Sequence, residues 1–171
     1  MNEGVTGDMS ATFFSYPMEP DSVMPHASPM ILIDQIDACD AESISASMTV
    51  RDDSPFVENG RVPSYIAVEY MAQTIAAYSG IDGRQKDEPV RIGFLLGTRK
   101  MTLNVPSFQV GDQLSLHGTV LYNDDGMASF DCTTTRDGET MASAIINVYQ
   151  PDDPGELIGQ GAEKPSGTRE T

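Results

Sequence analysis

Glu69 is the residue whose surroundings most clearly point to chemistry. It lies inside residues 62–80, which read VPSYIAVEYMAQTIAAYSG and are apolar on nearly every side. A helix of this kind is buried against other parts of the protein, and a buried carboxylate is costly unless it is paired or protonated. Because a carboxyl group in apolar surroundings can serve as a general acid, Glu69 is a candidate catalytic residue.

The stretch around Glu69 predicts one long helix over residues 62–80. Pro63 suits the first turn of a helix, and Gly80 and Gly83 offer a C-terminal stop. The stretch is too short and too polar to span a bilayer. We therefore expect a core helix that the rest of the chain wraps.

Six segments predict β-strands, two before the helix and four after it. Residues 43–51 and 113–122 alternate apolar and polar side chains, as half-buried strands do. The Asp137-Gly138 pair indicates a tight hairpin turn. The expected strands are residues 30–33 (extending to about residue 39), 43–51, 90–104, 113–122, 127–136 and 139–149. This order predicts an α+β fold in which an antiparallel sheet curls around one helix.

The strong acidity of the chain limits its partners. The 171 residues are enough for one domain and carry a net charge of −16, which argues against nucleic acid. Residues 51–100 hold seven basic and seven acidic side chains, whereas the other 121 residues hold three basic and nineteen acidic ones. An anionic partner would therefore dock near the middle of the chain. A merely solvated surface and a salt-rich cell interior are the alternative explanations of the acidity.

The two ends of the chain differ in composition from the middle. We expect a flexible arm over residues 1–16, one domain over residues 17–153 and a disordered acidic and polar tail over residues 154–171. No apolar run is long enough for a transmembrane segment, and the N-terminus lacks the features of a signal peptide. Cys39 and Cys132 show no CxxC spacing, which indicates reduced thiols in a cytoplasmic protein.

Several stretches resemble the 3-hydroxyacyl-acyl-carrier-protein dehydratases of fatty acid synthesis. PHASPMILIDQI at residues 25–36 resembles that family's PHRxPxLLxDRI segment. PSYIAVEYMAQ at residues 63–73 resembles its PGVLxxEAMAQ helix, and VGDQL at residues 110–114 resembles its PGDQL turn. The resemblance covers about residues 22–153. It implies a hot-dog fold, an antiparallel sheet wrapped around one long central helix.

Three further segments look like the dehydratases of aryl polyene gene clusters: VEYMAQ, GFLLGTR and NVYQP, at residues 68–73, 93–99 and 147–151. The resemblance implies a hydro-lyase that converts 3-hydroxyacyl-carrier-protein thioesters to trans-2-enoyl thioesters in polyene or fatty-acid-like biosynthesis. It places Glu69 at the position of the family's catalytic carboxylate. The expected partners are an acyl carrier protein and a second hot-dog chain, identical or related, with the acyl tunnel between the two. We expect no cofactor and no metal.

The sequence departs from the family at the catalytic histidine. The family carries it in a GHFPG segment before the helix, whereas residues 55–63 read PFVENGRVP and contain no histidine. His117 lies in an alternating strand on the face opposite its apolar residues, which predicts a surface histidine. His26 lies in the family's entry segment and is the candidate base, since imidazole changes charge near neutral pH.

Dehydration of a 3-hydroxyacyl thioester needs a base for the C2 proton, an acid for the leaving C3 hydroxyl and donors for the thioester oxygen. His26 would be the base and Glu69 the acid. The main-chain N–H groups of Ser64 and Tyr65, at the start of the helix, would bind the thioester oxygen. Asn59, near the position of the missing histidine, would orient water or substrate.

Two other functions stay open, because the fold does not determine the reaction. One is a catalytically impaired hot-dog subunit that binds acyl chains or pairs with an active partner. The other is an acyl thioesterase, which needs only a carboxylate and a bound carbonyl group. For a carrier protein, the expected docking area contains Arg61, Arg99 and Lys100.

Overall fold

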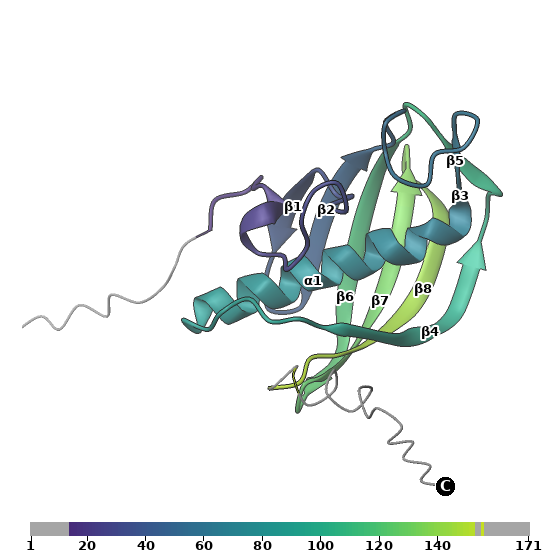
Figure 1. The fold of residues 1–171 in the computed structure, drawn as a ribbon. Helices are drawn as coiled ribbons and strands as arrows, with labels where there is room; N and C mark the ends of the chain where they lie inside the picture. Colours follow the sequence, from purple (N-terminus) through teal and green to yellow (C-terminus); the bar gives the residue numbers. More distant parts are fainter. Residues whose placement is uncertain (1–13, 153–154, 156–171) are drawn as a thin grey trace, which may run out of the picture.

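A six-stranded sheet that curves around one long helix forms the body of the protein (Figure 1). The structure, a computed structural model, describes residues 14–152 and 155. The helical elements are η1 (Pro20–Ser22), η2 (Ser64–Ile66) and α1 (Ala67–Gln85). The strands are β1 (Gln35–Cys39), β2 (Ser43–Thr49), β3 (Arg61–Pro63), β4 (Phe94–Leu103), β5 (Ser107–Gln109), β6 (Gln113–Asp124), β7 (Met127–Arg136) and β8 (Glu139–Tyr149). The predicted α+β architecture is confirmed.

The large sheet has the order β1-β2-β6-β7-β8-β4, with every neighbouring pair antiparallel. The β7–β8 hairpin closes through Asp137 and Gly138, whose φ angles of 51° and 81° suit a tight turn between twisted strands. The β2–β6 pair joins the strands before the helix to those after it. β4 forms one edge of the sheet, beside β8.

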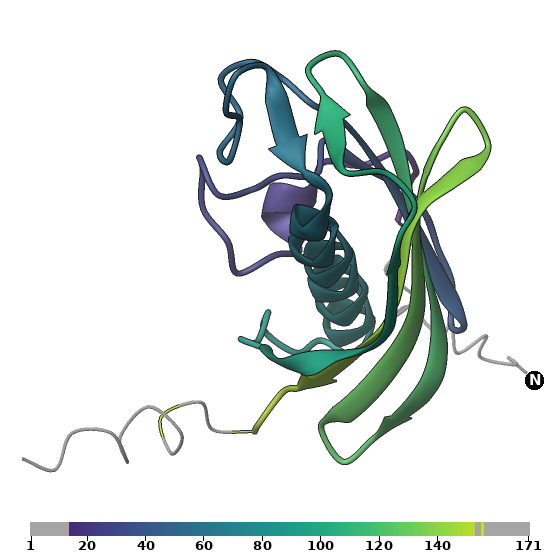
Figure 2. The ribbon, with the colours of Figure 1, turned by 90° about the vertical axis from the view of Figure 1, so that its right-hand side faces the viewer.

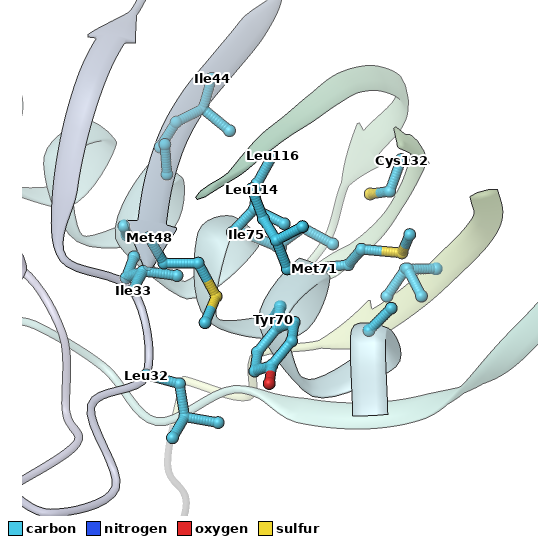
Figure 3. Close-up of a cluster of buried hydrophobic side chains, with 14 of the residues drawn as sticks. Leu32, Ile33, Ile44, Met48, Tyr70, Met71, Ile75, Leu114, Leu116 and Cys132 are labelled. Carbon is cyan, nitrogen blue, oxygen red and sulfur yellow. The ribbon is translucent and has the colours of Figure 1, made fainter. Parts of the chain in front are cut away.

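The sheet packs its apolar side chains against α1. Ile44 of β2 and Leu114 and Leu116 of β6 are buried, as the alternation in the sequence predicts. Figure 3 shows Leu114 and Leu116 gathered beside Met71 and Ile75 of the helix. Fully burying one such side chain stabilises a protein by about 1.5–3 kcal/mol. This contact fixes the helix across the sheet.

The N-terminal segment covers a second side of α1 (Figure 2, in purple). Val23 is fully buried, and a Cβ built on Gly80 would lie only 1.7 Å from the Val23 carbonyl oxygen. The two backbones therefore touch at Gly80. The segment after η1 carries His26 and then the buried residues Leu32 and Ile33.

The central helix differs at both ends from the prediction of residues 62–80. Pro63 ends strand β3, and a 3-10 turn precedes the α-helix. The helix continues to Gln85, so the prediction of a stop at Gly80 is wrong. Gly80 is small because another backbone approaches it, a contact that residues near it in sequence do not reveal.

The strand expected at residues 30–33 is absent, and β1 begins at Gln35. Leu32 and Ile33 are buried without forming a strand. The run of apolar residues at this point therefore indicates burial and not a β-strand. The short strands β3 and β5, which pair near the start of the helix (Figure 1), were not expected from the sequence.

The two chain ends are described only in part. Phe14 and Tyr16 pack against the core, whereas residues 1–13 of the expected arm and nearly all of the expected tail at 154–171 lie outside the described residues. The arm and the tail stay predictions. Cys39 is half-buried and Cys132 buried, both as free thiols. Among the described residues, no helix is long and apolar enough to cross a membrane.

Candidate active site

A cavity of ≈ 210 Å³ lies along the half-exposed face of α1. Successive turns of the helix contribute Glu69, Ala72, Ala76 and Ser79, which share one face because they are three or four residues apart. The remaining lining residues come from the N-terminal segment, the helix and the strands at the β4 edge: Pro25, His26, Ile75, Arg91, Gly93, Phe94, Leu95, Val148 and Gln150. The cavity is therefore an apolar groove with Glu69 and His26 in its lining.

Glu69 is half-buried and has a defined side-chain partner one turn further along α1. The Gln73 Nε2 group donates a hydrogen bond of 2.9 Å to Oε1 of Glu69. Gln73 therefore fixes the orientation of the carboxyl group through Oε1, and this bond leaves the other carboxyl oxygen, Oε2, unengaged.

Gln73 links Glu69 to the N-terminal segment. Its side chain is completely buried, its Oε1 accepts the Leu32 N–H at 2.8 Å, and its Nε2 also donates to the Met30 carbonyl at 2.7 Å. Sequence reasoning gave Gln73 no role of its own. An amide four residues after a carboxylate, in an otherwise apolar helix, was the signal available, because the two share a helix face.

His26 lines the same cavity as Glu69, so the structure brings the two expected catalytic residues together. The imidazole belongs to the segment that Gln73 anchors. Its Nδ1 atom is buried and has no hydrogen-bond partner among the described residues. Buried polar atoms normally have a partner, so this nitrogen is an unsatisfied polar group beside the cavity.

Ser64 does not offer the free N–H group that the sequence predicted. Its N–H donates to the Pro106 carbonyl at 3.1 Å, and the residue is buried. Tyr65, the next residue, belongs to the first turn, whose N–H groups have no acceptor within the helix. The Tyr65 side chain is 61% exposed, and neither residue lines the cavity.

Asn59 also lies outside the cavity lining. It is exposed and has a φ angle of 52°, followed by Gly60 at 72°. The two residues form the turn between Glu58 and Arg61, whose main-chain groups exchange hydrogen bonds of 2.8 and 3.1 Å. Asn tolerates this left-handed backbone better than most residues, so the turn by itself explains Asn59.

Burial raises the pKa of two other titratable side chains of the core. Burial raises the pKa of Tyr70 to about 12, and burial followed by the charge of Asp131 raises the pKa of Cys132 to about 12. Both side chains therefore stay protonated at neutral pH. No group of three or more side chains suited to hold a metal ion occurs in the described part of the chain.

The basic residues expected to dock a carrier protein lie on the surface. Arg99 and Lys100 are exposed on the edge strand β4, and Arg61 is exposed on β3. Lys100 has a φ angle of 49°, at the irregularity where the pairing of β4 with β8 shifts register. The position of His117 agrees with the sequence prediction, since it is exposed and its Nδ1 lies 2.9 Å from the Ser45 hydroxyl.

A sheet wrapped around one long helix is the hot-dog fold, and in this chain a carboxyl group lies on the open face of that helix. Comparison with known proteins narrows this class. The family model described as "ApeP dehydratase" matches residues 18–159. The chain belongs to the ApeP-like dehydratase family.

Individual relatives agree with this assignment. The dehydratase heterocomplex ApeI:P from Xenorhabdus doucetiae matches with a TM-score of 0.80 and 30% identity, over 85% of this chain and 99% of that chain. The FabZ 3-hydroxyacyl-[acyl-carrier-protein] dehydratase of Brucella ovis is 30% identical over 135 residues, covering 73% of this chain and 82% of the relative. The FabZ enzyme of Bartonella quintana is 28% identical over 131 residues, covering 73% and 83%.

These matches confirm the resemblance to hot-dog dehydratases and to those of aryl polyene clusters. They favour a dehydratase over a thioesterase. The roles of individual residues stay predictions, and they rest on the geometry of the cavity.

Proposed function

We propose that this chain removes water from 3-hydroxyacyl thioesters carried on an acyl carrier protein, with His26 and Glu69 as the reacting pair. The observation that carries the proposal is that both side chains line one largely apolar cavity. Membership of the ApeP-like dehydratases and similarity to the FabZ enzymes support the reaction and the carrier-bound substrate.

In the proposed reaction, His26 takes the proton from C2 of the substrate. The electron pair of that C–H bond forms the C2–C3 double bond as the C3–O bond breaks. Glu69 donates its proton to the departing hydroxyl, which leaves as water. The proton gained by His26 then returns to Glu69 through solvent, and the trans-2-enoyl thioester is released.

Charge builds up on the thioester oxygen while the C2 proton leaves. Ser64 cannot stabilise it in this conformation, since its N–H is bound to Pro106. We assign this role to the Tyr65 N–H, the next donor in the first turn and four residues before Glu69; because Tyr65 does not line the cavity, the thioester would lie beyond its Glu69 end. There the positive end of the helix dipole favours negative charge.

We further propose that the working unit is a pair formed along the β4 edge with a related hot-dog chain. β4 is an edge strand, so it presents unpaired main-chain groups to a second sheet. Leu96 on this strand is 55% exposed. The heterocomplex formed by the solved relative supports a pair of two different chains over a homodimer.

The reaction is tested by mass spectrometry of a 3-hydroxyacyl carrier protein incubated with the purified chain, alone and with a related hot-dog chain. Glu69→Gln and His26→Ala should each lower the rate by about 10²–10⁴-fold, the usual share of a general acid or base. His117→Ala is the matched control and should leave the rate unchanged. Release of the free 3-hydroxy acid from the carrier protein, instead of loss of water, would identify a thioesterase. An unchanged rate in His26→Ala would remove His26 from the mechanism but leave the enzyme class intact.

Pairing is tested by Leu96→Asp, which places a charge on the β4 edge outside the cavity lining. We expect it to abolish the pair in native mass spectrometry without unfolding the chain. Leu121→Asp, on a β6 side chain that is 54% exposed, is the matched control. An intact pair in Leu96→Asp would refute the β4 interface.

The lack of a histidine in residues 55–63, directly before the helix, favours one alternative, a catalytically impaired subunit that binds acyl chains for an active partner. In that case neither Glu69→Gln nor His26→Ala would change the rate of the assembled pair. The same assay therefore separates the two functions.

A further inference from the structure

At the end farthest from Glu69, the apolar cavity adjoins a second, polar cavity. The residues that line both cavities form a partition between them. Ser79, Arg91 and Gln150 line both the apolar cavity that contains Glu69 and a polar cavity of ≈ 320 Å³. The polar cavity is bordered by acidic residues that include Glu88 and Asp152. We propose that this partition, with Arg91 as its movable part, sets the length of acyl chain that the enzyme accepts. The inference rests on the proposed dehydratase function.

The apolar cavity has the shape of a channel along the helix. From Glu69 to Ser79 it follows almost three turns of α1, which is about 15 Å at the rise of an α-helix. The helix side chains between them that line it include Ala72 and Ala76, which are too small to fill the groove. An acyl chain whose C3 hydroxyl meets Glu69 can therefore extend along the helix until it meets Ser79 and Arg91.

Arg91 is held in place from the polar side. Its guanidinium group forms ion pairs with Glu88 and, at 2.9 Å, with Asp152. The Gln150 side-chain amide donates to the Arg91 carbonyl at 3.2 Å. The Asp152 side chain is fully exposed, so that pair contributes little. Glu88, whose side chain is 41% exposed, is the less exposed of the two partners, but its pair with Arg91 is still a surface ion pair.

These contacts give the partition its selectivity. A longer acyl chain would have to displace the guanidinium group and then enter a space bordered by charged side chains. Burying charged groups against hydrocarbon without their partners is unfavourable. One methylene group that a pocket cannot accommodate changes kcat/KM by about tenfold or more. A sharp upper limit of chain length is the expected consequence.

The test measures kcat/KM for carrier-bound 3-hydroxyacyl chains of increasing length, with the same hot-dog partner throughout. Arg91→Ala should accept longer chains than the unmodified enzyme and raise kcat/KM for the first excluded length by about tenfold or more. It should leave the shortest substrates unchanged. Ser79→Leu, which fills the same end from the helix, should shift the limit toward shorter chains. Lys86→Ala is the control, because Lys86 lines only the polar cavity.

A second measurement separates this inference from the proposed function. Binding of non-hydrolysable acyl-pantetheine amides, short and long, reports the length limit without any reaction. Tighter binding of the long amide to Arg91→Ala, with the short amide unaffected, supports the partition even in an inactive preparation. An unchanged limit in both variants overturns it, whereas dehydration of the short substrates would still uphold the proposed function.

Discussion

Gln73→Leu is the substitution that most directly tests how Glu69 is held. Leucine has a similar volume but neither donates nor accepts hydrogen bonds. In the variant the buried Leu32 N–H loses its acceptor, and the Met30 carbonyl and Glu69 lose a donor. Leaving a buried polar group without a partner costs about 1–3 kcal/mol. The bonds to the Met30 carbonyl and to Glu69 are only partly buried, so their loss costs less. We therefore expect the free energy of unfolding to fall by about 2–4 kcal/mol in total.

Two measurements and a matched control test this expectation. Urea unfolding should show a lower midpoint with an unchanged slope, since the surface exposed on unfolding is the same. The dehydration rate should fall at temperatures where the variant is still folded, because Glu69 loses its fixed orientation. Gln85→Leu, at the exposed end of the same helix, should change stability by less than about 0.5 kcal/mol. A Gln73→Leu variant as stable and as active as this control would refute the role given to the amide.

Three further predictions concern other parts of the molecule. Gly80→Ala should destabilise the protein by about 1–3 kcal/mol through overpacking, because the added Cβ would lie 1.7 Å from a carbonyl oxygen. Gly83→Ala is the control: its added Cβ would have its nearest contact at 3.7 Å, so it should be neutral or stabilising. Urea unfolding measures both. Burial raises the pKa of Cys132 from 9.0 to about 12, so as the pH rises the unfolded chain releases this proton before the folded protein does. The contribution of the thiol to the free energy of unfolding is therefore complete below pH 9.0 and lost toward pH 12. Cys132→Ala should remove this decrease from the measured dependence of the free energy of unfolding on pH. Reversing the charges of Arg99 and Lys100 to Glu should weaken carrier-protein binding at low salt and have less effect at high salt, as measured by titration calorimetry.

The strands after the helix could be predicted closely because their signals are local. β7 and β8 begin and end at the residues that the sequence indicated. Alternation with a period of two and the Asp137-Gly138 turn depend only on neighbouring residues. Such signals do not need the rest of the fold to be known.

The errors occur where distant residues decide the structure. Residues 30–33 were expected to form a strand, but the Gln73 side chain takes the hydrogen bonds that a neighbouring strand would otherwise make. The Ser64 N–H was expected to be free, but Pro106, far along the chain, accepts it. Neither contact leaves a pattern in the sequence around the residue concerned.

The candidate site follows the same division. The place of Glu69 on a core helix was predictable because its surroundings along the helix are apolar and because the stretch resembles a known motif, and its catalytic role stays a prediction. The presence of His26 in the same cavity depends on how the N-terminal segment crosses the helix (Figure 2). That crossing is fixed by Gly80 and by Gln73, two residues of the helix whose type only the folded structure explains.

The edge strand β4 connects assembly to the substrate site. Phe94 and Leu95 of this strand line the cavity, while the outer edge of the same strand is unpaired in the sheet order. A chain that pairs with β4 therefore also shapes the cavity beside Glu69. We propose His26 as the base in place of the histidine that residues 55–63 lack. A base supplied by the pairing chain would instead leave the rate of His26→Ala unchanged when that chain is present, so the rates with and without that chain distinguish the two sources.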